Sequence, residues 1–195
     1  MKPEEIKQLL ERAGAVRSGH FVLSSGRHSG VYVQCALALA HPIHAETLGR
    51  ALAERFREVA IDVVVSLALG GVVLGHEVAR ALGVRALFVE RDAAGKMALR
   101  REFSFEPGER VLVVEDVWTT GVSTREAMSV VESAGGRVAA VGALVDRSGG
   151  RLEWPVPALA LLPLAISSYE ADDCPLCRAG GVAVRPGSRF QKAAR

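Results

Sequence analysis

The chain has 195 residues, 49% of them hydrophobic, with a formal net charge of +2 and three cysteines. This length suffices for one well-buried domain, and the near-neutral charge gives no electrostatic argument for a nucleic-acid partner. Three cysteines do not make a secreted disulfide framework. The first residues are charged rather than apolar, and no apolar run reaches the roughly 20 residues of a membrane span. We therefore expect a soluble, cytoplasmic domain.

The first third of the chain predicts two helices with a pair of strands between them. Residues 3–13 have helical periodicity and stop at Gly14. The runs 20–23 and 31–37 are predicted strands joined by a polar, glycine-bounded turn, which places Cys35 in a buried strand. A second helix is expected to open at Pro42. Its predicted inward face is Leu48, Leu52, Phe56 and Val59.

The rest of the chain alternates between apolar strands and amphipathic helices. Such alternation predicts an α/β domain with a mostly parallel central sheet and helices on both faces. The predicted strands are 63–68, 84–89, 111–116, 138–145 and 158–162, and the predicted helices are 72–82, ended by Gly83, and one beginning at Ser123.

The most informative stretch is 111–124, which begins as a β-branched run typical of a strand buried on both faces. Two carboxylates, Glu115 and Asp116, follow where the strand should leave the core. A loop of small and hydroxyl residues comes next. Ser123 and Glu126 have capping-box spacing, which predicts a helix start. The expected apolar face of that helix is Ala127, Val130, Val131 and Ala134.

A strand, a hydroxyl-rich loop and a helix start together favour an anion site. Backbone N–H groups and the positive end of the helix dipole converge there, and Thr and Ser hydroxyls add donors. The acidic pair would repel a phosphate, so it suits ribose hydroxyls or a hydrated Mg²⁺. The carboxyl end of a buried strand is also where α/β sheets bind ligands.

The segment Val113-Val-Glu-Asp-Val-Trp-Thr-Thr-Gly-Val-Ser123 resembles the phosphoribosyl-diphosphate (PRPP) motif of type I phosphoribosyltransferases. The resemblance implies their fold with a small hood, at about residues 14–40 plus the C-terminal segment. It implies that the two acids hold the ribose hydroxyls and that the following loop holds the 5′-phosphate. The implied PRPP contacts along this segment are Glu115, Asp116, Val117, Trp118, Thr119, Thr120, Gly121, Val122 and Ser123.

The charged segment 90–110 interrupts the alternation and is the predicted lid. Part of it, 97–105, has partial strand periodicity and predicts a two-stranded arm, although a solvated hairpin is an equal alternative. A phosphoribosyl transfer would need such a lid to exclude water and to bring cations to the leaving pyrophosphate. Arg91 and Lys96 are the expected cations and, with Asp116, the expected catalytic residues.

Two further segments resemble orotate phosphoribosyltransferases. Phe21-Val-Leu-Ser-Ser-Gly-Arg-His-Ser29 is similar to their hood over the base, and Val145-Asp-Arg147 is similar to a strand end whose arginine meets orotate. The resemblance therefore implies Thr119 and Arg147 as orotate contacts. A carboxylate-bearing base does require a fixed cation. By its local sequence alone, Arg147 reads as a surface residue in a turn.

The chain departs from that family at three places and carries one unexplained motif. Ser24 stands where many members have a lysine, Asp92 follows Arg91 in a lid without histidine, and the loop near 70–71 lacks a common lysine. The motif is Cys174-Pro-Leu-Cys177, which is half of a zinc knuckle and looks like a tail seen in one branch of the family. We expect structural thiols there, since a closed metal site would need two subunits or distant histidines.

The sequence thus predicts a single-domain, Mg²⁺-dependent orotate phosphoribosyltransferase acting in pyrimidine synthesis. PRPP holds the Mg²⁺ near Asp116 with water, and no protein side chain is expected as its direct ligand. The resemblance also implies a homodimer whose lids reach across the interface. Two alternatives stay open: a purine-base phosphoribosyltransferase and a PRPP-binding regulator without catalysis.

Overall fold

The computed structural model describes residues 1–23 and 25–186, and Ser24 lies outside this part. A six-stranded sheet forms its centre, parallel except at one edge, where β5 runs antiparallel to β4. In spatial order the strands are β5 (Met97–Leu99), β4 (Arg85–Arg91), β3 (Val63–Leu67), β6 (Arg110–Trp118), β7 (Arg137–Asp146) and β8 (Ala158–Pro163).

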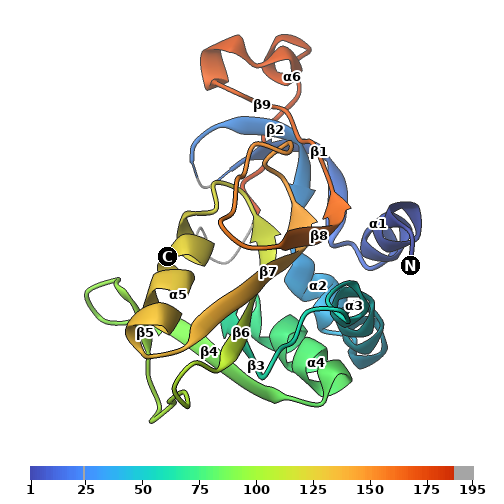
Figure 1. Cartoon of the computed structure of the whole chain (residues 1–195). Coiled ribbons are helices and arrows are strands. Elements are labelled where there is room, and N and C mark those ends of the chain that lie inside the picture. The colour runs from blue at the N-terminus through green and yellow to red at the C-terminus, as the bar shows by residue number, and fades with distance from the viewer. Residues whose placement is uncertain (24, 187–195) are drawn as a thin grey trace, which may run out of the picture.

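Helices cover both faces of this sheet, as predicted (Figure 1). The face bearing Val64 and Leu112 packs against four helices, while the face bearing Val63 and Val113 packs against one. The four valine and leucine residues of 111–114 are fully buried, because β6 lies in the middle of the sheet. The four helices on the first face are α1 (Pro3–Arg12), α2 (Cys35–Leu39), α3 (Pro42–Arg55) and α4 (Val72–Leu82). The single helix on the other face is α5 (Val122–Ser133).

A second, three-stranded antiparallel sheet lies at one end of the molecule (Figure 1). It joins the N-terminal hairpin to a segment from near the C-terminus, which continues into two short helical turns. Its members are β1 (Val16–Val22), β2 (His28–Val33) and β9 (Ser168–Tyr169), followed by η1 (Ala171–Asp173) and α6 (Pro175–Arg178). We call β1, β2 and the segment from β9 to Val184 the hood. Within the described residues, no helix is long and apolar enough to cross a membrane.

Cys35 lies in helix α2, so the prediction that it belongs to a strand is wrong, although the side chain is buried. The cause is strand pairing. Val33 pairs with Val16, the first residue of β1, so the chain beyond Val33 has no partner strand. The following Cys-Ala-Leu-Ala-Leu run is free to form a helix, for which alanine and leucine have high propensity.

The start of α5 also differs from the prediction. Its N-cap is Gly121 in the left-handed conformation, with a φ of 73°, and no side chain caps the helix. Glu126 instead forms an ion pair with Arg91, so the predicted capping box is absent. Of the predicted apolar face, Ala127 and Val131 are buried but Ala134 is exposed; Thr124 and Met128 are buried in addition.

The segment 90–110 begins as a tight hairpin between β4 and β5 and continues without regular structure. Asp92 shapes the turn, because its carboxylate accepts the backbone N–H groups of Ala94 and Lys96, each at 2.9 Å. The predicted two-stranded arm at 97–105 is therefore only partly correct. Met97–Leu99 is a strand, but its partner is the end of β4.

Candidate active site

The two carboxylates of the central motif lie near the carboxyl end of β6 and differ in what they face. Glu115 accepts a short hydrogen bond from the hydroxyl of Thr124, a fully buried residue in the first turn of α5. Asp116 instead lines a cavity between the sheet and the hood. Successive residues of a strand point to opposite faces, so one acid is held by the core helix and its neighbour is available to a ligand.

Burial makes both acids weak. It raises the pKa of Glu115 from 4.5 to about 7, an effect increased by the charge of Asp116 and opposed by the Thr124 hydrogen bond. The pKa of Asp116 is also raised by burial, against the effect of backbone N–H donors at its own position and at Val117. Two desolvated carboxyl groups side by side favour a ligand that brings hydroxyl donors or positive charge.

The loop between β3 and α4 approaches Asp116 closely. A side-chain carbon at Gly70 would lie 2.6 Å from a carboxylate oxygen of Asp116, which is closer than real atoms pack. Only glycine at this position leaves the carboxylate where it is.

The predicted phosphate loop turns from β6 into α5. Thr119 and Thr120 are exposed and line the cavity. Gly121 takes a positive φ, and a side-chain carbon there would lie 3.0 Å from Trp154 and 3.1 Å from Leu152, so both the backbone conformation and the close packing favour glycine. The first N–H groups of α5 have no intrahelical acceptors, as in every helix, so this turn forms an anion cradle beside the two threonines.

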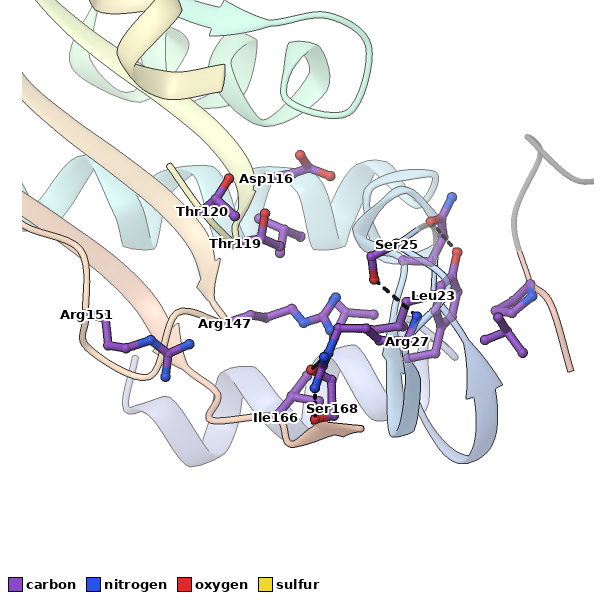
Figure 2. Close-up of a pocket in the computed structure, with 16 residues that line it drawn as sticks. Leu23, Ser25, Arg27, Asp116, Thr119, Thr120, Arg147, Arg151, Ile166 and Ser168 are labelled. Atoms are coloured by element: carbon purple, nitrogen blue, oxygen red, sulfur yellow. Dashed lines mark hydrogen bonds between the residues drawn. The ribbon is translucent and has the colours of Figure 1, made fainter. Parts of the chain in front are cut away.

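The cavity has a volume of about 910 Å³, which is within the usual range for small-molecule sites. Sheet and hood both line it, as Figure 2 shows. The sheet side contributes Asp116, Val117, Thr119, Thr120, Arg147 and Arg151. The hood side contributes Leu23, Ser25, Arg27, Tyr32, Gln34 and Ser168, with Ile166 and Pro186 beside them.

Arg147 is the central cation of the cavity. It extends between the Thr119–Thr120 loop and Ser168 (Figure 2). Its backbone N–H donates to Trp118 at 2.8 Å, and Asp146 fixes the same turn by accepting the N–H of Ser148 at 2.7 Å. The Nε of Arg147 is buried without a hydrogen-bond partner among the described residues, and burial lowers the pKa of the guanidinium. A desolvated, unpaired cation favours an anionic ligand.

The hood wall is fastened by a second arginine. Arg27 donates from Nε to the hydroxyl of Ser168 at 3.0 Å and from a terminal nitrogen to the carbonyl of the same residue at 2.7 Å. It also forms a short ion pair with Glu170. Across the cavity wall, Tyr32 donates its hydroxyl to Gln34 at 3.0 Å. Arg27 is thus already satisfied by the protein, unlike Arg147.

The structure brings some of the predicted site residues together and separates others. Of the predicted PRPP contacts, Asp116, Val117, Thr119 and Thr120 line the cavity. Trp118 is buried against Trp154, with ring centroids 5.0 Å apart, so only its backbone is near the loop. Six other predicted residues do not line the cavity. They are Glu115, which is bonded to Thr124, and Gly121, Val122, Ser123, Arg91 and Lys96.

The predicted lid cations point elsewhere in the single chain. Arg91 binds Glu126 at 2.6 Å and the carbonyl of Gly95 at 2.7 Å. Lys96 is exposed at the end of the β4–β5 turn, directly before β5. Within the described part of the chain it is the only cation of 90–110 without a carboxylate partner.

Sequence reasoning missed several residues that line the cavity, among them Tyr32, Gln34, Arg151 and Ser168. A signal existed for the first two. They are polar residues two apart in a predicted strand, and such residues share one face. Nothing local marks Ser168 or Arg151, since their place depends on how β9 and the β7–β8 loop are folded against the hood.

Comparisons with known proteins agree with this geometry. Residues 38–169 match the phosphoribosyl transferase domain family. An orotate phosphoribosyltransferase of Pelotomaculum thermopropionicum is 55% identical over 189 residues, which is 97% of this chain and 99% of that protein.

Solved structures show the same fold. The orotate phosphoribosyltransferase of Aeropyrum pernix superposes with a TM-score of 0.68 at 28% identity, covering 82% of this chain and 93% of that one. That of Mycobacterium tuberculosis in complex with inorganic phosphate has a TM-score of 0.68 at 31% identity, covering 83% and 95%. The full-length similarity, the type I fold and the acidic pair beside its hydroxyl loop lead to one assignment: the chain belongs to the phosphoribosyltransferase family and, within it, to the orotate phosphoribosyltransferases.

Proposed function

We propose that the protein transfers the 5-phosphoribosyl group of PRPP to orotate, releasing pyrophosphate and forming orotidine 5′-monophosphate. The observation that carries this proposal is the guanidinium of Arg147 in the cavity of Asp116 and the Thr119–Thr120 loop, whose Nε is buried without a hydrogen-bond partner among the described residues. Orotate is a planar base with a carboxylate, which is the ligand that such a guanidinium binds with two parallel hydrogen bonds. An uncharged purine would leave this cation unpaired.

The remaining groups of the cavity suit PRPP. The 5′-phosphate fits the turn from Thr119 to Ser123, where N–H groups and hydroxyls converge. Inorganic phosphate bound to the Mycobacterium tuberculosis relative supports a phosphate site on this fold. The ribose hydroxyls fit Asp116, which lines the cavity and would accept their hydrogen bonds. Glu115 would reach them only by exchanging its hydrogen bond with Thr124. Ionised carboxylates beside the ribose also stabilise the positive charge that develops on it during transfer.

The acidic pair also fits Mg²⁺, because two desolvated carboxyl groups with raised pKa values gain from a nearby cation. Glu115 and Asp116 would hold the ion through water and PRPP. When bound, Mg²⁺ neutralises negative charge on the pyrophosphate leaving group. The hood, with Arg27 and Tyr32, covers the base and keeps water from the reacting carbon.

Lid cations complete the site in this proposal, and they come from a second copy of the chain. Arg91 and Lys96 do not line the cavity of their own chain, and Lys96 is free of carboxylate partners within the described part. An arm of about twenty residues extends some tens of ångströms at roughly 3.3 Å per residue, enough to cross a two-fold interface.

A steady-state assay with PRPP and each candidate base, with and without Mg²⁺, tests the proposal. We expect turnover with orotate that depends on Mg²⁺, and none with adenine or xanthine. Asp116→Asn should cripple the use of PRPP while circular dichroism and the unfolding midpoint stay near those of the parent. Turnover with a purine but not with orotate would replace this function, and binding of PRPP without turnover of any base would indicate a regulator.

A further inference from the structure

Four metal-ligating side chains converge in the hood, outside the cavity described above. His20 lies on β1 and His28 begins β2. Cys174 directly precedes α6, and Cys177 lies within it. One potential ligand atom from each lies within 4.8 Å of all the others. The two histidines are far from the two cysteines in the sequence: 154 residues separate His20 from Cys174, and 149 separate His28 from Cys177. The folded hood therefore supplies the distant histidines that a lone Cys-x-x-Cys pair lacks.

The distances between these atoms approach those of a tetrahedral site. His20 Nε2 is 3.6 Å from the sulfur of Cys174 and 3.7 Å from that of Cys177, and His28 Nδ1 is 3.3 Å from the latter. Around Zn²⁺, with bonds of about 2.3 Å to sulfur and about 2.0 Å to nitrogen, tetrahedral geometry separates nitrogen and sulfur by roughly 3.5 Å. The two ring nitrogens, 2.8 Å apart, need to separate by only about half an ångström more.

The hydrogen bond on the far side of His20 fixes the ring for this task. Its Nδ1 lies 2.9 Å from the carbonyl oxygen of Gly181. Because a carbonyl oxygen can only accept, Nδ1–H is the donor of this hydrogen bond. The proton is thus on Nδ1, and the lone pair of Nε2 faces the two sulfurs and His28. Metal-ligating histidines characteristically donate their other N–H to a backbone carbonyl in this way.

Few apolar side chains hold the C-terminal part of the hood, and Leu176, which lies near Gly30 of β2, is only partly buried. Neither η1 nor α6 contains a buried residue, while Cys174 at the start of α6 is completely buried, and Val182 beyond it is exposed. The segment nevertheless returns to β1, where Val184 exchanges two backbone hydrogen bonds of 2.9 Å with His20 and Val22. Segments with so little core are commonly stabilised by a metal or a disulfide.

We propose that His20, His28, Cys174 and Cys177 bind one structural Zn²⁺ that fastens the C-terminal segment of the hood to the β1–β2 hairpin. Two thiolates and two imidazoles in a tetrahedral arrangement select Zn²⁺, whereas Mg²⁺ prefers oxygen ligands. All four positions are filled by protein, so the site is closed and has no place for a catalytic water. It acts on the cavity only indirectly, by holding the hood that carries Arg27 and Ser168.

Metal analysis of the whole protein tests the proposal. Protein purified under reducing conditions without chelator is dialysed and its metals are measured by mass spectrometry. We expect about one zinc ion per chain. His28→Asn and Cys177→Ser should each lose most of it. Two matched controls should keep it: His76→Ala, an exposed histidine on α4, and Cys35→Ala, the remaining cysteine.

Two readouts on the wild-type protein keep the test valid if a variant does not fold. Replacement of zinc by Co²⁺ should produce a thiolate-to-metal charge-transfer band and the visible absorption of a tetrahedral ion. Removal of zinc should increase hydrogen exchange across 170–184 and leave β3 and β6 unchanged, because the central sheet has its own core.

Three results would overturn the proposal. The first is less than about a tenth of a zinc ion per chain together with no cobalt band in the reduced protein. The second is a disulfide between Cys174 and Cys177 in protein alkylated as it is isolated under reducing conditions. The third is full zinc content in both ligand variants, which would place the metal elsewhere.

Discussion

Glu115 is a carboxyl group that the folded chain prefers to keep protonated. Its pKa rises from 4.5 to about 7 because it is buried. The folded state therefore binds this proton more tightly than the unfolded state. The resulting stabilisation is fully present below pH 4.5 and is lost as the pH rises through 7. A ligand that brings positive charge or hydroxyl donors offsets this cost of ionisation.

Replacing Glu115 with glutamine should remove that pH dependence. Glutamine has the same shape and can still accept the hydroxyl proton of Thr124. We expect Glu115→Gln to gain stability relative to the parent as the pH rises from 4.5 to 8, by about 3 kcal/mol at most. Urea unfolding of both proteins across this range measures the difference. A difference that does not change with pH would mean that the pKa of Glu115 is the same in the folded and unfolded states.

Arg147 should affect orotate binding without contributing to stability. Its Nε is desolvated and unpaired within the described residues, so Arg147→Met removes a cost of folding rather than a contact. We expect the KM for orotate to rise roughly 100-fold, the size expected when one partner of a buried charge pair is truncated. The unfolding free energy should stay the same or increase.

Arg147→Lys is the matched control for this prediction. It keeps the charge but loses the planar fork, so its KM should lie between those of the parent and Arg147→Met. An unchanged KM for orotate in Arg147→Met would show that the base is held by other residues.

At the scale of elements, the loop from β3 to α4 constrains Asp116. Gly70→Ala places a methyl carbon 2.6 Å from a carboxylate oxygen of Asp116, so the carboxylate must move away. The backbone there does not require a positive φ, so the substitution acts through this contact. We expect kcat/KM for PRPP to fall by about 100-fold, as for a misplacement of about 1 Å.

A double-mutant cycle separates this contact from general damage to the loop. In an Asp116→Asn background, Gly70→Ala should cause little further loss, because both changes act on one carboxylate. If the losses in kcat/KM from the two substitutions are additive, Gly70→Ala does not act through the carboxylate of Asp116.

The segment 90–110 is held by weak interactions, and we predict that it is mobile without ligand. Arg91, Arg100 and Arg101 are engaged in exposed or partly exposed ion pairs, each worth about 0.2–1 kcal/mol. Met97 is its one buried apolar side chain in the described core, and Leu99, Phe103 and Phe105 pack against that core while only partly buried. Hydrogen exchange should be fast across 92–96 and 100–109 and slower with PRPP. Protection equal to that of β6 in the free protein would indicate a rigid arm.

For the whole molecule, the decisive prediction is a homodimer with shared sites. Lys96→Ala removes a lid cation and Asp116→Asn removes an acid of the cavity, so each variant alone should have little activity. If the lid acts across the interface, a mixed dimer has one site with both lesions and one with neither. Activity should then return after subunit exchange, to about a quarter of the parent level for random pairing.

The complementation requires proof that mixed dimers form. Differently tagged variants can be co-purified, and their mass measured by light scattering. Mixed dimers without activity would mean that the lid closes over its own chain, and a monomer at assay concentration would reject the shared site.

The sequence by itself determined the elements whose signals are local. The β-branched run before Glu115 predicts the central strand, and glycine after 72–82 predicts the end of α4, which Gly83 indeed caps with a φ of 72°. The motif at 113–123 was sufficient to predict the type I fold. These predictions succeeded because a strand buried on both faces and an amphipathic helix each require a pattern within a dozen residues.

Only the tertiary structure decided what depends on partners far along the chain. Cys35 is helical because no strand pairs with the chain beyond Val33. Glu126 forms an ion pair with Arg91 instead of capping α5. Burial of Arg147 depends on the hood above it. His20 and His28 meet Cys174 and Cys177 only because β2 pairs with β9 and Val184 pairs with β1. The physical reason is the same in each case: hydrogen-bond and side-chain partners are chosen by proximity in the folded chain, which local sequence does not encode.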